Sequence, residues 1–366
     1  MAVSPRVPIL AAWREGFKGK PSAFGCAGRR ACGRGSALAQ FPAASSLGNR
    51  DRQFRRLASE RKASIMTKTS PKHSKPHRDL HAEITQRLIA AIESDPGEPK
   101  MPWRRAGRPP WMPENALTRH AYNGINVLNL WVATEMRSFS SPIFATYRQW
   151  QELGAQVRKG AKSELVVFYK EYETDPNPEN EADDGKRRVA RASFVFNADD
   201  VENYVAPEQP ELLGPITRIE AADRFIAHTG IPVAHRGDRA FYRPSTDEIT
   251  MPEEGLFTGT ETMNRDEAYY AVLLHEATHA TGHKNRCDRD FTARFKKDAY
   301  AAEELVAEIG SAFLCAELGI TQDTRADHAQ YLAHWLQLLK NDPKAIFTAA
   351  AKASQAVAWL KKQQPS

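Results

Sequence analysis

Residues 267–282 read EAYYAVLLHEATHATG, and this stretch decides how the rest of the chain is interpreted. Its apolar positions and the glycine at its end predict a helix that stops there. At about 100° per residue, His275 and His279 lie about 40° apart on one helix face, one turn along, so their imidazoles can share a cation. Glu276 projects beside them, where a carboxylate can polarise a bound water and accept its proton. The stretch therefore predicts a zinc site (Zn²⁺) with Glu276 as general base.

The His-Glu-x-x-His pattern is rare by chance. With 11 histidines in 366 residues, it is expected by accident about 0.02 times per chain, and its helical context lowers that figure further. An extended motif with a third ligand six residues after His279 is excluded, because that position is Asn285. His283 lies about 80° round the helix from His275 and just past Gly282. The third ligand is therefore expected from another element.

A following helix, predicted over residues 300–318, offers the carboxylates of Glu303, Glu304 and Glu308. Glu304 and Glu308 share a face at i,i+4, so one can bind the metal while the other orients a ligand imidazole from behind. We expect Glu304 to bind zinc and Glu308 to lie behind it, with Glu308 as the ligand in the alternative arrangement. A solvated acidic helix face is the less favoured interpretation of the same residues.

Length and composition bound the class of protein. The 366 residues allow two domains plus a tail, and 41% hydrophobic with 26% charged residues exclude a collagen-like or wholly disordered chain. No stretch approaches the roughly 18 uncharged apolar residues of a transmembrane helix, so we expect no membrane partner. The four cysteines show no C-x-x-C spacing, which favours a reducing compartment, the cytoplasm.

The net charge of +6 is unevenly distributed. Residues 1–65 hold 13 Lys and Arg against three acids, a net of +10, which leaves −4 for residues 66–366. The first segment is also rich in Gly, Ala and Ser without periodicity, so we expect residues 1–76 to be a disordered basic extension. Met66 opens a polar leader and is the expected natural start, with an organelle transit peptide as the less favoured interpretation.

Two domains are predicted, over residues 77–204 and 216–366, joined by a Pro-containing acidic linker over 205–215. Helical and β-rich patterns occur in both halves, so the fold class is α+β. The expected elements are a helix from Asp79 to Pro96, helices over 127–136 and from Ser141 to Gly154, a hairpin of 165–172 and 189–196, a helix near 219–228, strands over 240–242 and 248–251, and three or four helices up to Leu360.

The first domain has a local positive charge. From Lys100 to Lys170 there are 11 Lys and Arg against four acids, and aromatic residues interleave with them. Single-stranded DNA is bound in this way, by cations on phosphates and aromatic rings under bases. The residues expected to contact DNA are Trp103, Arg104, Arg105, Arg148, Trp150, Arg158, Lys159 and Lys162. Trp150 also fits a core position of its predicted helix, and the 158–162 loop also fits a solvated turn.

The ordered motifs of both halves resemble those of the ArdC-type antirestriction proteins over about residues 76–362. They are Pro102-Trp103, Tyr122-Asn123-Gly124-Ile125-Asn126, Ser141-Pro142, Gln149-Trp150, Gly154, Val157–Gly160, Val195–Asn197, His275–His279, Thr281–His283, Arg286 and Glu303–Glu308. The resemblance implies an N-terminal domain that binds single-stranded DNA and a C-terminal zincin-like metallopeptidase domain. It adds Tyr122, Asn123 and Asn126 to the expected DNA contacts. Ala280 and Cys287 depart from the family pattern at packing positions near the site.

The His-Glu-x-x-His and Glu-x-x-x-Glu pair also resembles the gluzincin side of the zincin metallopeptidases. That fold implies a strand at the cleft edge, which residues 240–252 would provide. Tyr242 in this strand is a candidate oxyanion donor, although a packed strand residue is the favoured interpretation.

The resemblance implies a protein of a bacterial mobile element that protects incoming DNA from restriction in the cytoplasm. Single-stranded DNA is the expected partner, and a protein substrate is a further one. Two alternatives are a DNA-tethered zinc peptidase acting on a DNA-associated protein, and a non-catalytic DNA-binding protein with a structural zinc. Two histidines and one carboxylate leave an open coordination position, which disfavours the purely structural zinc.

Overall fold

The computed structural model describes residues 79–94, 111–174, 186–206, 215–259, 263–320 and 329–365. The predicted extension 1–76, the segment Trp103–Arg105 and most of the predicted linker lie outside these ranges. The described residues from Asp79 onward belong to one compact unit. Among them, no helix is both long and apolar enough to cross a bilayer.

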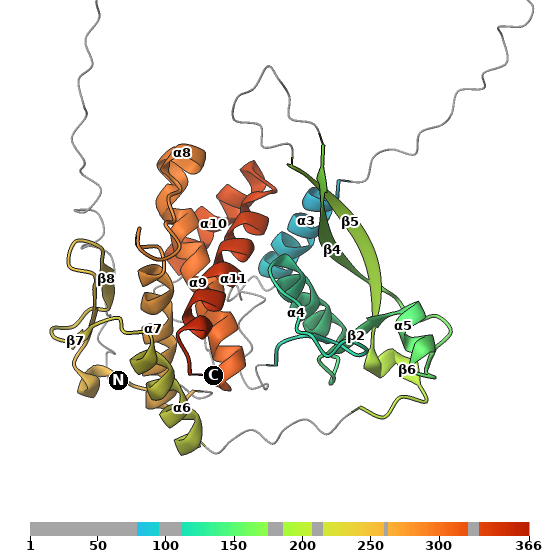
Figure 1. Ribbon diagram of the computed structural model, residues 1–366, viewed down its shortest axis with the longest axis horizontal. Coiled ribbons are helices and arrows are strands. Elements are labelled where there is room, and N and C mark those ends of the chain that lie inside the picture. The colour runs from blue at the N-terminus through green and yellow to red at the C-terminus, as the bar shows by residue number, and fades with distance from the viewer. Residues whose placement is uncertain are drawn as a thin grey trace, which may run out of the picture. The chain divides into compact units, whose positions relative to one another are not determined.

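The described part of the N-terminal half combines helices with a mixed four-stranded sheet and a separate strand pair (Figure 1). Its elements are α3 (Leu80–Glu93), β1 (Glu114–Asn115), α4 (Ile125–Arg137), β2 (Ile143–Thr146), α5 (Tyr147–Glu152), β3 (Gln156–Val157), β4 (Glu164–Glu173), β5 (Lys186–Asn197) and β6 (Val201–Glu202). The sheet order is β1-β2-β5-β4, in which β1 and β2 are parallel and the other pairs antiparallel. Strands β3 and β6 pair with one another.

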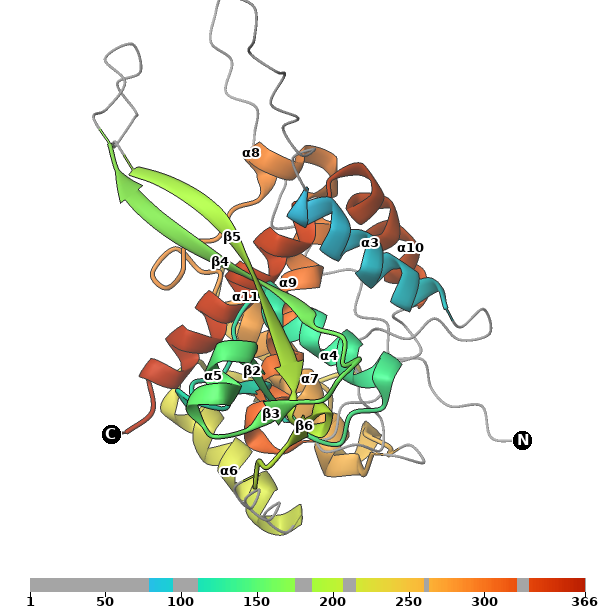
Figure 2. The same ribbon diagram turned by 90° about the vertical axis from the view of Figure 1, so that its right-hand side faces the viewer.

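The hairpin of β4 and β5 confirms the prediction made for residues 165–172 and 189–196. Its strands stay paired from Glu164 opposite Val195 to Glu173 opposite Lys186. Strand β5 pairs with β2 only through residues 195–197, so the rest of the hairpin is a two-stranded arm. Figure 2 shows this arm as a long ribbon that crosses in front of α4.

The predicted helix from Ser141 to Gly154 is only partly present. Residues 143–146 form strand β2, in which Ile143, Phe144 and Ala145 are buried, and α5 begins at Tyr147. Thr146 caps α5, since its side chain accepts from the backbone N–H of Gln149 and the Gln149 side chain reaches back. Pairing with β1 and β5 thus outweighs the local Ser-Pro helix signal.

The C-terminal half is mostly helical around a small three-stranded sheet. Its elements are α6 (Pro215–His228), β7 (Val233–His235), β8 (Phe241–Arg243), β9 (Glu248–Met251), α7 (Arg265–Ala280), α8 (Thr292–Phe295), α9 (Ala299–Leu318), α10 (Ala329–Asn341) and α11 (Ala345–Lys362). The sheet order is β7-β9-β8, with β7 parallel and β8 antiparallel to β9. Strand β7 was not predicted, and α6 begins four residues earlier than expected. The predicted α+β class is confirmed in both halves.

One hydrophobic core runs through both halves. The Trp131 ring of α4 meets the Phe313 ring of α9 edge-on, with 5.7 Å between centroids. The backbone N–H of Gly124 donates to the Ser354 hydroxyl of α11 at 2.9 Å. The contact surface of α7 and α9 lies at the centre of the C-terminal half, and it carries the residues of the predicted site.

Candidate metal centre

Helix α7 carries the two histidines on its buried side. Asn264 caps the helix, because its side chain accepts from the N–H of Glu267 while the Glu267 carboxylate accepts from the N–H of Asn264. His275 and His279 are both buried, and their ring centroids lie 4.8 Å apart. The i,i+4 spacing thus produces the juxtaposition that the sequence predicted.

Helix α9 approaches α7 closely at one small residue. A methyl group added at Gly310 would lie 2.5 Å from Cγ2 of Thr278, so only glycine fits this contact. One residue further on, the Ser311 hydroxyl donates to the backbone carbonyl of Ala271 at 3.0 Å. Because the two backbones are held so near, the carboxylates on the first half of α9 reach the histidines of α7.

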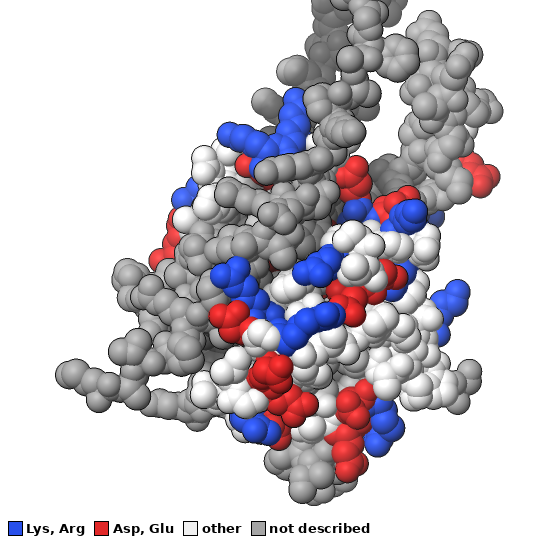
Figure 3. Space-filling view, turned by 90° about the vertical axis from the view of Figure 1, so that its left-hand side faces the viewer, with Lys and Arg blue, Asp and Glu red and all other residues white. Residues whose placement is uncertain are grey.

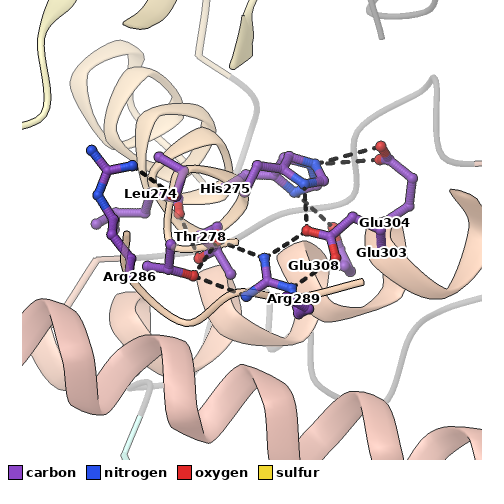
Figure 4. A network of polar contacts seen from close by, with 11 residues as sticks. Leu274, His275, Thr278, Arg286, Arg289, Glu303, Glu304 and Glu308 are labelled. Atoms are coloured by element: carbon purple, nitrogen blue, oxygen red, sulfur yellow. Dashed lines mark hydrogen bonds and ion pairs between the residues drawn. The ribbon is translucent and has the colours of Figure 1, made fainter. Parts of the chain in front are cut away.

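The Glu304 carboxylate faces the Nε2 atoms of both imidazoles, and Figure 4 shows its contacts as dashed lines. Its oxygens are 3.6 Å from Nε2 of His275 and 3.4 Å from Nε2 of His279. One ligand atom from each of the three residues lies within 4.8 Å of the other two, and all three residues are buried. Two imidazoles and a carboxylate around one point form the donor set of catalytic zinc sites.

The other ring nitrogen of each histidine faces a second carboxylate. Nδ1 of His275 is 3.8 Å from Glu308, and Nδ1 of His279 is 3.2 Å from Glu303. Carboxylates in this position fix the tautomer and orientation of a metal-binding histidine. Of the two arrangements left open by the sequence, the geometry favours Glu304 at the metal position and Glu308 behind His275.

Glu303 and Arg289 form a buried ion pair that the sequence analysis did not identify. Arg289 donates to both Glu303 oxygens, at 2.7 Å from Nε and 2.6 Å from a terminal nitrogen, and its side chain is 1% exposed. It also donates to the Thr278 carbonyl and the Thr281 hydroxyl (Figure 4). The loop after α7 thereby locks the carboxylate that holds His279. An arginine ten residues beyond His279 carries no local signal for this role.

The electrostatics of the centre keep its carboxylates ionised. Burial opposes the charge on His279, but Glu304 and Glu303 outweigh it and raise the His279 pKa to about 10. Burial likewise opposes the charge on Glu304, yet the two imidazoles hold its pKa well below the usual range. Arg289 and His279 lower the Glu303 pKa to about 2 against the same burial. Glu303 and Glu304 are therefore ionised, and the ionised carboxylate is the form in which Glu304 can bind a metal.

Glu276 also supports a metal site at this centre. Its side chain is buried, and its Oε1 atom has no hydrogen-bond partner among the described residues. A buried carboxylate oxygen without a donor is costly, by about 1–3 kcal/mol or more. A water held at the open position of a metal would supply that donor, so these residues fit a divalent metal.

Behind the centre, Arg286 ties the end of α7 to the turn between β8 and β9. It donates to both oxygens of Asp247, at 2.7 and 2.9 Å, and to the carbonyl of Ala280. The Tyr242 hydroxyl donates to Asp247 at 2.7 Å, and its ring is buried. Burial, followed by Asp247, raises the Tyr242 pKa. Tyr242 is thus engaged in the sheet turn, which favours its interpretation as a packed strand residue.

Comparison with known proteins agrees with this geometry. Residues 78–199 match the family model of the N-terminal domain of the anti-restriction factor ArdC, and residues 220–352 match a zincin-like metallopeptidase model. The metal-free crystal structure of the antirestriction protein ArdC from plasmid R388 is 38% identical and superposes with a TM-score of 0.62, covering 78% of this chain and 98% of that one. The chain belongs to the ArdC antirestriction family.

This ArdC-family chain is also similar to a second structure of the R388 protein, to an uncharacterized protein and to a DNA primase. The Mn(II)-bound structure of the R388 protein is 37% identical, with a TM-score of 0.61. The uncharacterized protein y4eC of Sinorhizobium fredii is 44% identical over 78% of this chain and 92% of its own length. The DNA primase TraC of Escherichia coli is 34% identical over 76% of this chain, which spans only 20% of that primase.

Three residues predicted to contact DNA lie inside this ArdC-family protein. Trp150 is fully buried and its indole N–H donates to the Phe196 carbonyl, so it offers no ring face to a base. Tyr122 is also buried, with its hydroxyl within 3.5 Å of the Phe144 carbonyl. We therefore correct the predicted contact set by removing Trp150, Tyr122 and Asn126.

Asn126 has a structural role that explains its burial. Its side-chain amide donates to the carbonyl of Val167 at 2.9 Å and accepts from the N–H of the same residue at 2.8 Å. Asn129, one turn later in α4, donates to the carbonyl of Leu165. The two amides close the outer edge of β4 there, where its backbone groups have no neighbouring strand.

The remaining predicted DNA contacts differ in their surroundings. Asn123, Arg148, Arg158, Lys159 and Lys162 are exposed. Arg148 pairs with Glu152 at 3.3 Å, and Arg158 donates to the Asp199 carbonyl and lies 3.7 Å from Glu202. Trp103, Arg104 and Arg105 lie outside the described residues.

Figure 3 shows one face of the C-terminal half with the charges of the described residues. Lys and Arg side chains are there interspersed with Asp and Glu and separated by uncharged areas. A surface of mixed sign gives little attraction for a polyanion.

Proposed function

We propose that this protein is an antirestriction protein of a mobile element that binds single-stranded DNA with residues 77–204 and carries a zinc peptidase centre within residues 216–366. It would act in the bacterial cytoplasm on incoming DNA. One observation carries the catalytic part: the unpartnered, buried oxygen of Glu276 beside the His275, His279 and Glu304 cluster. A purely structural metal site has no use for such a carboxylate.

Each residue of the centre has a proposed task. Zinc, when held by His275, His279 and Glu304, would supply Lewis acidity at the open position. Glu276 would take a proton from the attacking water and pass it to the leaving amine of a peptide bond. The carboxylates behind the two imidazoles, Glu303 and Glu308, would keep the Nε2 atoms directed at the metal.

Two competing functions share this geometry. In one, the protein is chiefly a DNA-tethered peptidase whose substrate is a DNA-associated protein. In the other, metal only holds the fold and strand binding alone protects the DNA. The unpartnered Glu276 oxygen favours a working peptidase over the second alternative.

The test uses Glu276→Gln, with Glu253→Gln as a matched exposed control. Purified wild type should contain about one zinc per chain, and Glu276→Gln should keep that zinc but lose cleavage of a protein substrate. Glu304→Ala should fall well below one zinc per chain. Full occupancy in Glu304→Ala would move the third ligand to Glu308 or Glu303, and failure of wild type to bind zinc or manganese would overturn the metal centre.

The same variants separate the biological alternatives. Protection of a transferred plasmid in a restricting host is measured for Glu276→Gln against wild type. Loss of protection places peptidase chemistry in the mechanism. Protection equal to wild type assigns it to DNA binding alone, and the peptidase part of the proposal is then withdrawn.

A further inference from the structure

The two-stranded arm of β4 and β5 exposes an unusual amount of apolar surface. Phe168 and Tyr169 are each 50% exposed, Val189 is 48% exposed, and Phe194 is 45% exposed. Phe168 and Val189 lie on one face of the arm, and Tyr169 and Phe194 lie on the other, because neighbouring side chains of a strand alternate between faces. The residues that the strand register places on the same face decide what that face can bind.

Strand alternation places Phe168, Lys170 and Tyr172 on one face of β4. The residues of β5 opposite Phe168 and Lys170 are Arg191 and Val189, and paired residues of an antiparallel ladder share a face. We call these five residues the hairpin platform. It combines two aromatic rings and one branched aliphatic side chain with two cations.

The cations of the platform gather at one aromatic ring. The Lys170 ammonium lies 5.1 Å and the Arg191 guanidinium 5.9 Å from the centroid of the Tyr172 ring. Arg191 also donates to the Tyr172 hydroxyl at 2.5 Å. Two positive charges held beside the half-buried Tyr172 ring, close to the exposed Phe168 ring, form a site for an anion next to a flat apolar surface.

Glu164, at the start of β4 and on the same face as the platform, is an acid whose charge is compensated by two arginines. Glu164 is buried and accepts from Arg87 of α3 and Arg137 of α4, at 2.5 and 3.3 Å. Its charge is therefore compensated inside the protein. The exposed part of the platform thus keeps the positive sign of Lys170 and Arg191.

The outer edge of β4 is closed near the platform by Asn126 and Asn129, which bond its backbone at residues 165 and 167. A partner strand therefore cannot add to the sheet at these residues. The closed edge excludes strand addition at these residues as the mode of binding. The face of the arm that carries the side chains is the surface that remains accessible.

We propose that the hairpin platform binds single-stranded DNA, with a base stacked on Phe168 and phosphates held by Lys170 and Arg191. This inference rests on the proposed function above and adds residues outside the set predicted from the sequence. A single strand fits because its bases are unstacked and can present a face to Phe168, whereas a duplex hides its base faces. Phe168 and Tyr172 are about 13 Å apart along the strand, so they serve bases that are not adjacent.

The test is fluorescence anisotropy of the full chain with a labelled oligothymidine across a salt series. Phe168→Ala should weaken binding by about 5- to 150-fold, the range expected for one stacked base. Phe168→Trp should bind like wild type, because the ring is kept. Lys170→Gln with Arg191→Gln should lower the slope of log K against log salt by about 1.4, or about 0.7 for each lost phosphate contact.

Exposed residues of the C-terminal half are the controls. Leu256→Ala removes an apolar side chain that is 42% exposed, and Arg224→Gln removes a cation whose side chain is 62% exposed. Both should bind DNA like wild type. All variants should keep the wild-type melting temperature, since the side chains changed are exposed.

The outcomes distinguish this inference from the function on which it rests. If wild type fails to bind the oligonucleotide at low salt, the proposed function itself fails. If wild type binds and both platform variants bind equally well, the platform is wrong while the function stands. If Phe168→Ala instead abolishes a dimer seen by sedimentation and leaves DNA binding unchanged, the platform is a self-association surface and the inference is overturned.

Discussion

His279 is held at both nitrogens of its ring. Nε2 faces Glu304, while Nδ1 lies 3.2 Å from Glu303, whose two oxygens accept from Arg289. The chain of contacts therefore starts at a buried guanidinium in the loop after α7 and ends at the metal position. At the scale of single residues, the ion pair of Glu303 and Arg289 should set the orientation of the His279 ring and also contribute to the stability of the fold.

The two roles of the pair can be separated by substitution. Glu303→Gln leaves Arg289 buried without a countercharge and should lower the free energy of unfolding by about 3–5 kcal/mol. Replacing both partners, as Glu303→Leu with Arg289→Met, removes both charges and should cost much less stability. Zinc affinity should still fall about 10- to 100-fold in the double variant, because His279 loses its Nδ1 partner.

Urea denaturation measures the stability part, and competition with a chromogenic chelator measures zinc affinity. Each is recorded on wild type, on Glu303→Gln and on the double variant. A double variant with wild-type zinc affinity would show that the pair only supports the fold.

At the scale of elements, the crossing of α7 and α9 is set by a contact between Thr278 and Gly310. Because the two backbones approach closely at this contact, the glutamate side chains of α9 reach the histidines of α7 directly. Close approach of two helices requires a small residue at the crossing point, and a single added methyl group pushes the backbones apart.

Gly310→Ala should therefore destabilise the protein by about 1–3 kcal/mol and weaken metal binding together. Thr278→Ala removes the Cγ2 and Oγ1 atoms that the new methyl group would meet, so it should restore much of both losses in the double variant. Gly255→Ala is the control, because a methyl group there meets nothing within 4 Å. Additive effects of Thr278→Ala and Gly310→Ala in thermal and zinc titrations would contradict this explanation.

At the scale of the whole described unit, the two family domains are not independent. The hydrophobic core includes residues of both, and direct bonds join them, such as Thr85 Oγ1 to the Pro343 carbonyl at 2.7 Å. The contact of Trp131 with Phe313 places an N-terminal aromatic ring on the helix that carries Glu304. Unfolding of one half should therefore destabilise the other half.

This coupling predicts that the protein unfolds in one calorimetric transition. Zinc at 100 times its dissociation constant should stabilise the folded state by about 2.7 kcal/mol. That gain should appear equally in tryptophan fluorescence, which includes Trp131 and Trp150 of the N-terminal half, and in far-ultraviolet circular dichroism. Two transitions, of which zinc moves only one, would show that the halves unfold separately.

Much of the candidate centre could be predicted from the sequence, because its geometry is local. His275 and His279 share a face by helix periodicity alone, and the same periodicity relates Glu304 to Glu308. The hairpin of β4 and β5 was also predictable, since β-branched and aromatic residues run through both strands. The family assignment followed from the order of such local motifs.

Other features depended on contacts between distant segments. The 141–154 segment carries a helix signal, yet pairing with β1 and β5 makes its first part a strand and buries Trp150. The ion pair of Arg289 with Glu303 depends on how closely α9 lies against α7. Local periodicity determines which side chains share a face of an element. Only the packing of elements decides which faces meet, because burial and pairing energies are summed over residues far apart in the chain.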